Sequence, residues 1–213
     1  MKLYSYWRSS AAYRVRIALH LKNLAYELVT THLARDEQHG GAYLQMNPQG
    51  LVPALEHDGQ VFVQSLAIIE YLDSIAEQPR LLPPDPVARA HVCAMAQAIA
   101  CDIHPLNNLR VLNYLKNTMA QPSAAIEQWY GHWHHLTLGA LEQWALRFST
   151  AGRYLFGDAV SLADVLLVPQ LYNARRFAVG LDDYPTLVAI DAGLQRLPAF
   201  AAASPERQPD AVA

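Results

Sequence analysis

The chain has few of the features that mark secreted, membrane-spanning or nucleic-acid-binding proteins. Its 213 residues include only two cysteines, and no apolar run approaches the roughly 20 residues that span a bilayer. The first residues lack the apolar core of a signal peptide. The net charge is −3, from 16 basic and 19 acidic residues, so no basic excess points to nucleic acid or to an anionic membrane. We therefore expect a cytoplasmic protein that binds neither nucleic acid nor a membrane.

The two cysteines, Cys93 and Cys101, exclude a disulfide framework. If both lie on one helix, their separation along its axis is roughly 12 Å, whereas the Cα atoms of a disulfide lie within about 7 Å of each other. We expect two buried thiols in a reducing compartment. Neither cysteine is near Ser9, the serine of the motif described below, so a reactive sulfur at that motif has to come from a ligand.

Composition and pattern indicate two domains. Hydrophobic residues make up 52% and charged residues 16% of the chain, as in a globular protein with a packed core. Residues 1–80 alternate strand-like and helical segments in the order β-α-β-α-β-β-α, with Asp58-Gly59 as the turn of a hairpin. Residues 81–86 contain three prolines and predict a linker. Residues 87–213 have a helical pattern, which predicts an α/β domain followed by an all-α domain.

The helical region carries several local signals. Residues 87–118 predict a long helical segment with a kink at Pro105. Ser161-Leu162-Ala163-Asp164 is a capping-box variant that opens a further helix. Pro185 lies at the start of the last expected helix, and residues 204–213, rich in proline, alanine and charge, predict a frayed tail.

A motif at the end of the first strand suits an anion. Arg8-Ser9-Ser10 lies where a strand ends and a helix begins, and free backbone N–H groups and the helix dipole favour negative charge there. A serine hydroxyl at this point could donate a hydrogen bond to a thiolate. The alternative is that Ser9 or Ser10 is only the N-cap of the helix, which is the usual role of serine in this position.

Two further motifs lie at the ends of other strands. Pro53 cannot join a sheet through an N–H group, and a cis Val52-Pro53 bond would expose the backbone of Val52. Because cis bonds are a minority even before proline, the residues alone do not establish one. Gln64-Ser65 lies at the start of the helix after the hairpin, and Ser65 is the expected N-cap. This start is either a second anion-favouring position near the Ser9 loop or a plain helix cap.

Taken together, these motifs resemble those of the zeta-class glutathione transferases. The resemblance covers almost the whole chain in the family's order and rests on Arg8-Ser9-Ser10, Arg14-Val15-Arg16-Ile17-Ala18-Leu19, Asn47-Pro48-Gln49-Gly50-Leu51-Val52-Pro53-Ala54-Leu55, Gln64-Ser65-Leu66-Ala67-Ile68-Ile69-Glu70-Tyr71-Leu72 and Asp102-Ile103-His104-Pro105-Leu106-Asn107-Asn108-Leu109-Arg110-Val111-Leu112. It implies a thioredoxin-like α/β domain, an all-α domain, glutathione as cofactor and a homodimer. The class includes maleylacetoacetate isomerases, and the last segment, with Arg176, also resembles maleylpyruvate isomerases.

The resemblance implies roles for individual residues. Ser9 and Ser10, with Arg8 beside them, match the catalytic positions next to the thiol. The implied glutathione-binding residues are Gln38, Gln49, Val52, Pro53, Gln64, Ser65, Asp102, His104 and Asn108. One position departs from the animal and plant pattern, because Ala11 replaces a cysteine after the two serines. That change removes a thiol that modulates some members and keeps the hydroxyls.

Three arginines carry the substrate hypothesis. Arg8, Arg110 and Arg176 come from distant parts of the chain, and the usual role of such a residue is a surface salt bridge. The family fold would bring all three to one cleft, where guanidinium groups suit the carboxylates of a small dicarboxylate. The implied function is glutathione-dependent cis–trans isomerisation of maleylacetoacetate or maleylpyruvate. The alternative is a glutathione transferase or dehalogenase for small electrophilic or halogenated acids.

The sequence predicts no metal site. His132, His134 and His135 lie close together, but aromatic residues interrupt them and no acidic residue or cysteine has a suitable spacing. We interpret them as part of a partly exposed helix face.

Overall fold

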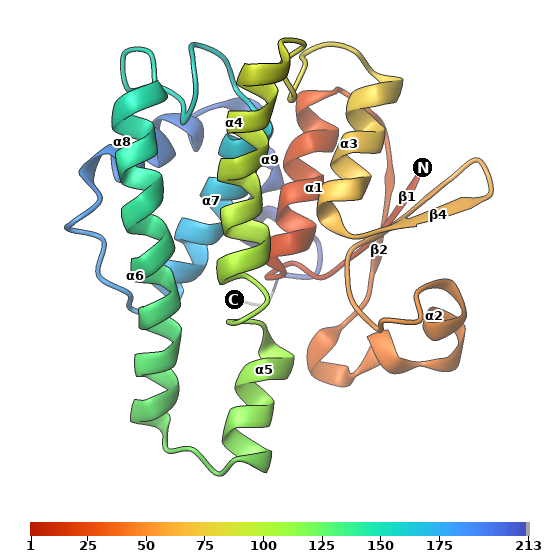
Figure 1. Ribbon diagram of the computed structural model, residues 1–213. Helices are drawn as coiled ribbons and strands as arrows, with labels where there is room; N and C mark the ends of the chain where they lie inside the picture. Colours follow the sequence, from red (N-terminus) through yellow and green to blue (C-terminus); the bar gives the residue numbers. More distant parts are fainter. Residues whose placement is uncertain (212–213) are drawn as a thin grey trace. The chain divides into compact units, whose positions relative to one another are not determined.

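The computed structural model describes residues 1–211 and divides into two compact units. The first unit joins Met1–Arg80 with Arg196–Ala213, and the second is Leu81–Gln195. Figure 1 shows the path of the chain through both. The sequence pattern predicts one helical domain over residues 87–213, whereas the contacts group the residues after Gln195 with the first unit.

A four-stranded mixed sheet forms the centre of the first unit. Its strands follow the order β2-β1-β3-β4, with β1 parallel to β2 and antiparallel to β3, which in turn pairs antiparallel with β4. The strands are Lys2–Ser5 (β1), Glu27–Thr30 (β2), Ala54–His57 (β3) and Gln60–Val63 (β4). Asp58 and Gly59 both have positive φ angles, 49° and 73°, as a type I′ turn requires. The predicted hairpin is therefore confirmed, and so is the thioredoxin-like α/β fold class.

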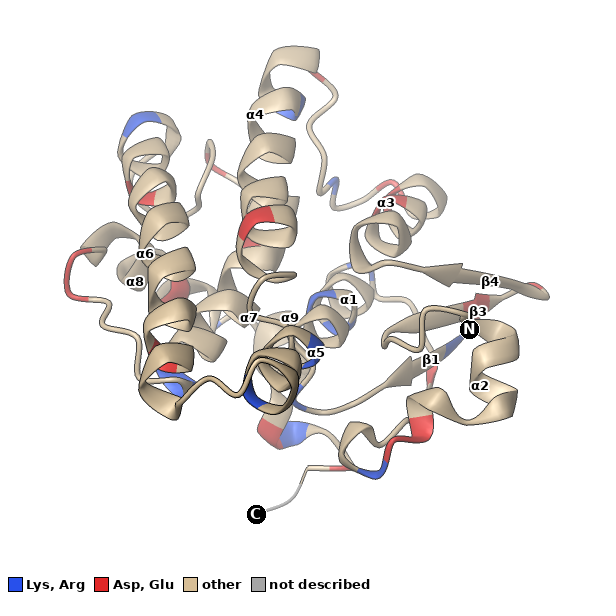
Figure 2. Ribbon diagram, turned by 60° about the horizontal axis from the view of Figure 1, so that its bottom comes forward, with Lys and Arg blue, Asp and Glu red and all other residues tan. Residues whose placement is uncertain are grey.

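The helices of the first unit surround one buried helix. Ser10–Leu21 (α1) packs between Ser65–Ile75 (α3) and Pro198–Ala203 (α9). Gly41–Met46 (α2) follows two 3₁₀ turns, Leu33–Arg35 and Glu37–His39. Because α1 has neighbours on several sides, all its residues from Ser10 to Leu19 are buried, including the basic positions visible on α1 in Figure 2.

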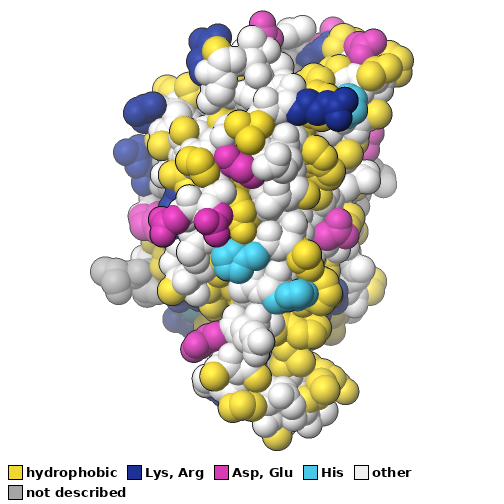
Figure 3. Space-filling view, turned by 60° about the vertical axis from the view of Figure 1, so that its left-hand side comes forward, with side chains coloured by type: hydrophobic (Ala, Val, Ile, Leu, Met, Phe, Trp, Pro, Cys, Tyr) yellow, Lys and Arg dark blue, Asp and Glu magenta, His cyan; other side chains and the backbone are white. Residues whose placement is uncertain are grey.

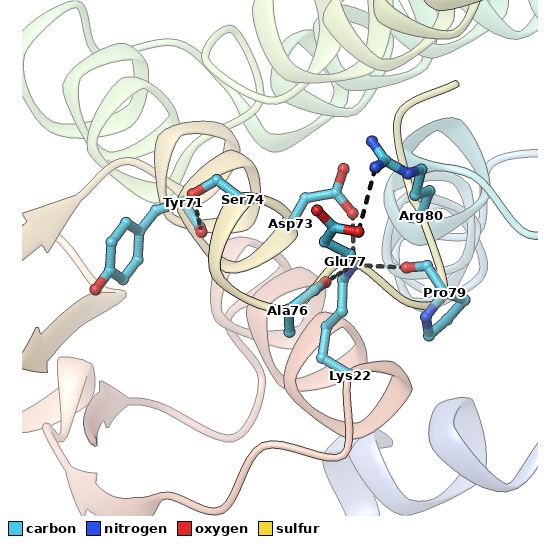
Figure 4. A network of polar contacts seen from close by, with 8 residues as sticks. All are labelled: Lys22, Tyr71, Asp73, Ser74, Ala76, Glu77, Pro79 and Arg80. Atoms are coloured by element: carbon cyan, nitrogen blue, oxygen red, sulfur yellow. Dashed lines mark hydrogen bonds and ion pairs between the residues drawn. The ribbon is translucent and has the colours of Figure 1, made fainter. Parts of the chain in front are cut away.

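The end of α1 is joined to the end of α3 by a buried lysine. The Lys22 ammonium group donates to the Asp73 carboxylate at 2.6 Å and to the carbonyls of Ala76 and Pro79 at 2.6 and 2.5 Å (Figure 4). A cation is also favoured at a helix C-terminus by the helix dipole. All three ammonium protons have acceptors, so Lys22 is a structural cation that holds the end of α3 and the segment after it against α1.

The helical unit is less regular than its apolar pattern suggests. The predicted segment 87–118 is divided by two π-helical stretches and a turn, and the turn contains Pro105, which cannot continue a helix. Its helices are Pro86–Gln97 (α4), Leu109–Asn113 (α5), Ser123–Phe148 (α6), Leu162–Arg176 (α7) and Pro185–Leu194 (α8), with π-helical turns at Ala98–Ile103 and Tyr114–Thr118. None of the helices within residues 1–211 is long and apolar enough to cross a membrane.

Two local expectations in this unit had opposite outcomes. The capping box is confirmed, because the buried Asp164 accepts from the Ser161 N–H and hydroxyl groups and from the Leu155 N–H, each at 2.8 Å. Burial raises the pKa of Asp164 to about 6, against the effect of these hydrogen bonds. The expected burial of both thiols is wrong, because Cys93 is half-buried and Cys101 is exposed; both are free.

Candidate active site

Ser9 is the N-cap residue of α1. Its hydroxyl oxygen accepts from the Ala12 N–H at 3.2 Å, and its backbone is extended, with φ −68° and ψ 115°. A hydroxyl that accepts a hydrogen bond still has its own proton to donate, so the capping role and a catalytic role are compatible. Ser9 is half-buried, whereas Ser10 begins the helix and is buried. Of the two serines, Ser9 is the more accessible to a ligand.

Arg8 has no ion-pair partner among residues 1–211. Its guanidinium group lies over the Trp7 ring, 4.4 Å from the centroid, and its Nε atom is buried without a hydrogen-bond partner in the described part of the chain. Stacking on an aromatic ring holds a guanidinium group while leaving its hydrogen-bond donors available. Arg8 is therefore not occupied by a surface salt bridge.

The backbone before Val52 is held by two side chains that we did not identify from the sequence. The Leu51 carbonyl accepts from the Tyr43 hydroxyl and from the Asn47 side-chain amide, both at 2.7 Å. The Val52-Pro53 bond is cis, as the family resemblance implied. The only sequence signal for Asn47 was its position in the turn before Gly50. Gly50 has a φ angle of 61°, which favours glycine, and a Cβ atom there would lie 2.6 Å from the His39 ring.

Gln64 and Gln49 are brought together by the fold. The Gln64 amide donates to the Gln49 carbonyl oxygen at 2.6 Å. Gln64 has a φ angle of 70° and is the N-cap of α3 without a side-chain capping bond. The expected N-cap, Ser65, is instead the first helical residue and accepts from Arg14 at 3.3 Å. A non-glycine residue in this backbone region is strained, and such strain concentrates at functional sites.

Gln38 is buried in the turn before α2. Its amide nitrogen donates to Asp36 at 2.9 Å, whereas its amide oxygen is buried and has no partner among the described residues. Leaving such an oxygen unpaired costs free energy, so this atom is suited to a ligand that carries a hydrogen-bond donor.

The predicted residues of the helical unit lie around the turn before α5 and at the end of α7. Asp102 is exposed in the first π-helical stretch, and His104 ends that stretch. Asn108 is the N-cap of α5 and accepts from the Arg110 N–H at 3.1 Å. Arg110 is exposed in the first turn of α5.

Arg110 and Arg176 are exposed, and neither has an ion-pair partner in the part of the chain that the structure describes. Arg176 lies 4.9 Å from the centroid of the Phe177 ring. The neighbouring Arg175 differs, because it pairs with the buried Asp191 at 2.6 Å. The salt-bridge interpretation therefore holds for Arg175 and not for the other two.

The turn between the first π-helical stretch and α5 is anchored on α6. The Asn107 amide donates to the Tyr130 carbonyl at 3.0 Å and lies 2.9 Å from the buried His134 ring, which in turn contacts Gln170 at 2.7 Å. The Trp129 indole donates to the Leu106 carbonyl at 2.9 Å. These bonds hold the segment that carries the predicted ligands His104 and Asn108, although no local pattern indicated them.

The three histidines of α6 differ in their surroundings. His134 points into the interior, whereas His132 and His135 are exposed, and Figure 3 shows histidine side chains at the surface of the helical unit. No group of three potential ligands occurs within residues 1–211.

The buried His134 should make the protein less stable in acid. Burial lowers its pKa to about 4, so between about pH 6.5 and about pH 4 the unfolded chain binds a proton that the folded chain does not. His134 therefore makes the free energy of unfolding fall as the pH is lowered through this range, by about 2 kcal/mol at about pH 5, while the raised pKa of Asp164 acts in the opposite direction. Urea unfolding at neutral pH and at about pH 5 should therefore show a change with pH that is less favourable, by about 2 kcal/mol, in the wild type and in the surface control His132→Gln than in His134→Gln. An equal change in His134→Gln would contradict the assignment.

Comparison with known proteins places the chain in a family. Residues 3–80 match the glutathione S-transferase N-terminal domain. Over 212 residues the chain is 51% identical to the probable maleylacetoacetate isomerase of Vibrio cholerae serotype O1, covering 98% of this chain and 97% of that protein. A holo structure of maleyl pyruvate isomerase, a bacterial zeta-class glutathione S-transferase, is 46% identical, superposes with a TM-score of 0.97 and covers 100% of both chains. The chain belongs to the zeta-class glutathione S-transferases.

Other members of the class have been solved with ligands in the active site. Maleylacetoacetate isomerase from Anaeromyxobacter dehalogenans 2CP-1, with bound dicarboxyethyl glutathione and citrate, is 42% identical to this zeta-class chain. The TM-score is 0.87, and the match covers 100% of this chain and 97% of that one. The family resemblance inferred from the motifs is thus confirmed, together with the fold class of both units.

Proposed function

We propose that this protein catalyses the glutathione-dependent cis–trans isomerisation of a maleyl keto-acid, maleylacetoacetate or maleylpyruvate, to its fumaryl isomer. The observation that carries the proposal is the full-length identity to proteins with these two names, 51% and 46%. We further propose that the protein is cytoplasmic and works as a homodimer.

The residues of the first unit fit glutathione. The peptide needs an extended backbone to pair with, an anion site for the γ-glutamyl carboxylate and a donor or acceptor near its glycine end. Val52 supplies the first, and Gln64 and Ser65 at the uncapped start of α3 supply the second. The unpaired oxygen of Gln38, with Gln49 beside Gln64, supplies the third. The family resemblance adds three glutathione-binding residues from the helical unit, which are Asp102, His104 and Asn108.

Bound glutathione would supply the thiolate that adds to the cis double bond, permits rotation about the resulting single bond and is then released. The hydroxyl of Ser9 donates a hydrogen bond to the sulfur, and the N-terminus of α1 adds the favourable end of the helix dipole. Both interactions lower the pKa of the thiol and keep it ionised at neutral pH. No net proton is gained or lost in the isomerisation, so no side chain has to act as a base.

The arginines bind the carboxylates of the substrate. Arg8, Arg110 and Arg176 have no ion-pair partner among the described residues, and each guanidinium group can bind a carboxylate through two parallel hydrogen bonds. Charge that develops on the keto-acid during the reaction is stabilised by the same donors. The second candidate function is that of a glutathione transferase or dehalogenase for small electrophilic or halogenated acids. It would use the same thiolate and arginines.

Turnover assays separate these functions. The protein should isomerise maleylacetoacetate or maleylpyruvate only when glutathione is present, and faster than it acts on a halogenated acid under the same conditions. Failure to isomerise either maleyl acid would overturn the proposed function. Activity on the halogenated acid alone would favour the second candidate.

Arg176→Ala should separate substrate binding from cofactor binding. A charge-assisted hydrogen bond contributes about 1.5–3 kcal/mol, so we expect kcat/KM for the maleyl acid to fall by about 10- to 100-fold. The dissociation constant of glutathione, measured by calorimetry, should change much less. Arg153→Ala, which removes an exposed arginine of a loop, is the matched control and should leave both quantities unchanged. An equal loss of both in Arg176→Ala would make Arg176 structural.

A further inference from the structure

The end of the chain is hydrogen-bonded to the loop that carries Arg8 and Ser9. The Asp210 carboxylate accepts from the backbone N–H of Trp7 at 3.0 Å, across 203 positions of sequence. The Trp7 amide lies between the last residue of β1 and the first of α1, where neither the sheet nor the helix pairs it. A carboxylate acceptor makes this bond charge-assisted and therefore stronger than a bond between neutral groups.

The backbone of the same residue is also held through its carbonyl group. Trp7 O accepts from Arg16 at 2.9 Å, and Arg16 simultaneously donates to the Ala203 carbonyl at 3.0 Å, at the end of α9. The buried Gln208 donates to the Ser204 carbonyl at 2.8 Å, which stiffens the segment between α9 and Asp210. Residues 204–211, the part of the predicted frayed tail that the structure describes, are therefore ordered through their contacts with the loop; the last two residues lie outside the described part.

Apolar packing continues this attachment beyond Asp210. Ala211 packs against the cluster formed by Tyr6, Trp7, Tyr43, Val52 and Ala54. This cluster includes the residue that precedes Arg8 and the residue assigned to the backbone of glutathione. The tail thus bonds to the Trp7 backbone and packs against a cluster that includes residues of both parts of the candidate site.

We propose that Asp210 is a positioning residue, which fixes the Trp7 peptide so that the Arg8 guanidinium group and the Ser9 hydroxyl are correctly placed for the reaction. The inference rests on the proposed function of that loop. Arg8 depends on Trp7 directly, because its guanidinium group lies over the Trp7 ring. Ser9 follows Arg8 directly in the chain. A displacement of the loop therefore moves the Ser9 hydroxyl and weakens the hydrogen bond that it donates to the glutathione sulfur.

Three variants test the inference. Asp210→Ala removes the acceptor, Asp210→Asn keeps an acceptor oxygen without the charge, and Asp182→Ala removes an exposed carboxylate from a loop of the helical unit. Because small displacements of reacting groups reduce rates strongly, we expect Asp210→Ala to lower kcat by about tenfold. The pKa of the bound glutathione thiol, followed by ultraviolet absorbance of the thiolate, should rise. The affinity for glutathione should change little.

The outcomes are distinct. Recovery of most of the lost rate and of the thiol pKa in Asp210→Asn, with Asp182→Ala equal to wild type, supports a positioning role. Unchanged kcat and thiol pKa in Asp210→Ala would overturn it, and so would a parallel loss of stability and glutathione binding that Asp210→Asn does not rescue. A wild-type protein that binds and ionises glutathione but isomerises neither maleyl acid would overturn the proposed function, while the thiol pKa of the variants would still test Asp210.

Discussion

Replacing Arg16 with methionine should reduce the free energy of unfolding by roughly 4 kcal/mol. Arg16 is fully buried in α1 and donates to four acceptors. They are the Ser5 hydroxyl and the carbonyls of Tyr6, Trp7 and Ala203, at 3.0, 3.4, 2.9 and 3.0 Å. Methionine fills a similar volume but leaves these oxygens without the donor, and each unpaired buried polar group costs about 1–3 kcal/mol.

The charge of Arg16 is not the main source of this effect. Burial lowers its pKa to about 10, with Asp210 and Glu206 among the acidic groups that oppose the shift. The guanidinium group therefore stays charged at neutral pH, and its hydrogen bonds offset the free-energy cost of removing the charge from water. Arg16→Lys keeps the charge but cannot reach four acceptors in different directions. It should retain only part of the stability.

Urea unfolding with linear extrapolation measures these differences. Arg153→Met, at an exposed position, is the matched control and should stay within about 0.5 kcal/mol of the wild type. A stability of Arg16→Met close to that of the control would show that the four acceptors find other partners, and that α9 is held to α1 by apolar packing alone.

The position of Arg16 also shows what the sequence can predict. Signals that act over a few residues, such as Asp58-Gly59 in the hairpin and Ser161 with Asp164 at α7, specify their structures directly, and both predictions are confirmed. One partner of Arg16, the Ala203 carbonyl, lies instead at the end of α9, 187 positions away, and the short Pro- and Ala-rich sequence of this helix gives no sign of where it packs. The ordered tail after α9 was missed for the same reason.

The candidate site shows the same division between local and distant determinants. The serine at the start of α1 was predicted from its place between a strand and a helix, and the structure makes Ser9 the N-cap. The helix after the hairpin begins differently, because Gln64 adopts a positive φ angle and takes the N-cap position expected for Ser65. Apolar spacing also does not distinguish an α-helix from the π-helical stretches on either side of α5.

Ser9→Ala should lower kcat for isomerisation by about 100-fold, since removing a donor that stabilises charge in the reaction costs about 10²–10³ in rate. The same change should raise the pKa of the bound thiol, which follows from the loss of a hydrogen bond to the charged form. It also removes the acceptor for the Ala12 N–H and should cost about 1 kcal/mol of stability. Steady-state kinetics, thiolate absorbance and urea unfolding measure the three effects.

Two further substitutions at this position separate the catalytic hydroxyl from the helix cap. Glycine is nearly as good an N-cap as serine, to within a few tenths of a kcal/mol, but has no hydroxyl. Ser9→Gly should therefore match the rate loss of Ser9→Ala while losing less stability. Ser9→Thr keeps both the cap and the hydroxyl and should retain most of the rate. If the rate instead followed stability across the three variants, Ser9 would be only a cap, and the sulfur would be ionised by the backbone N–H groups and dipole of α1 without a side-chain donor.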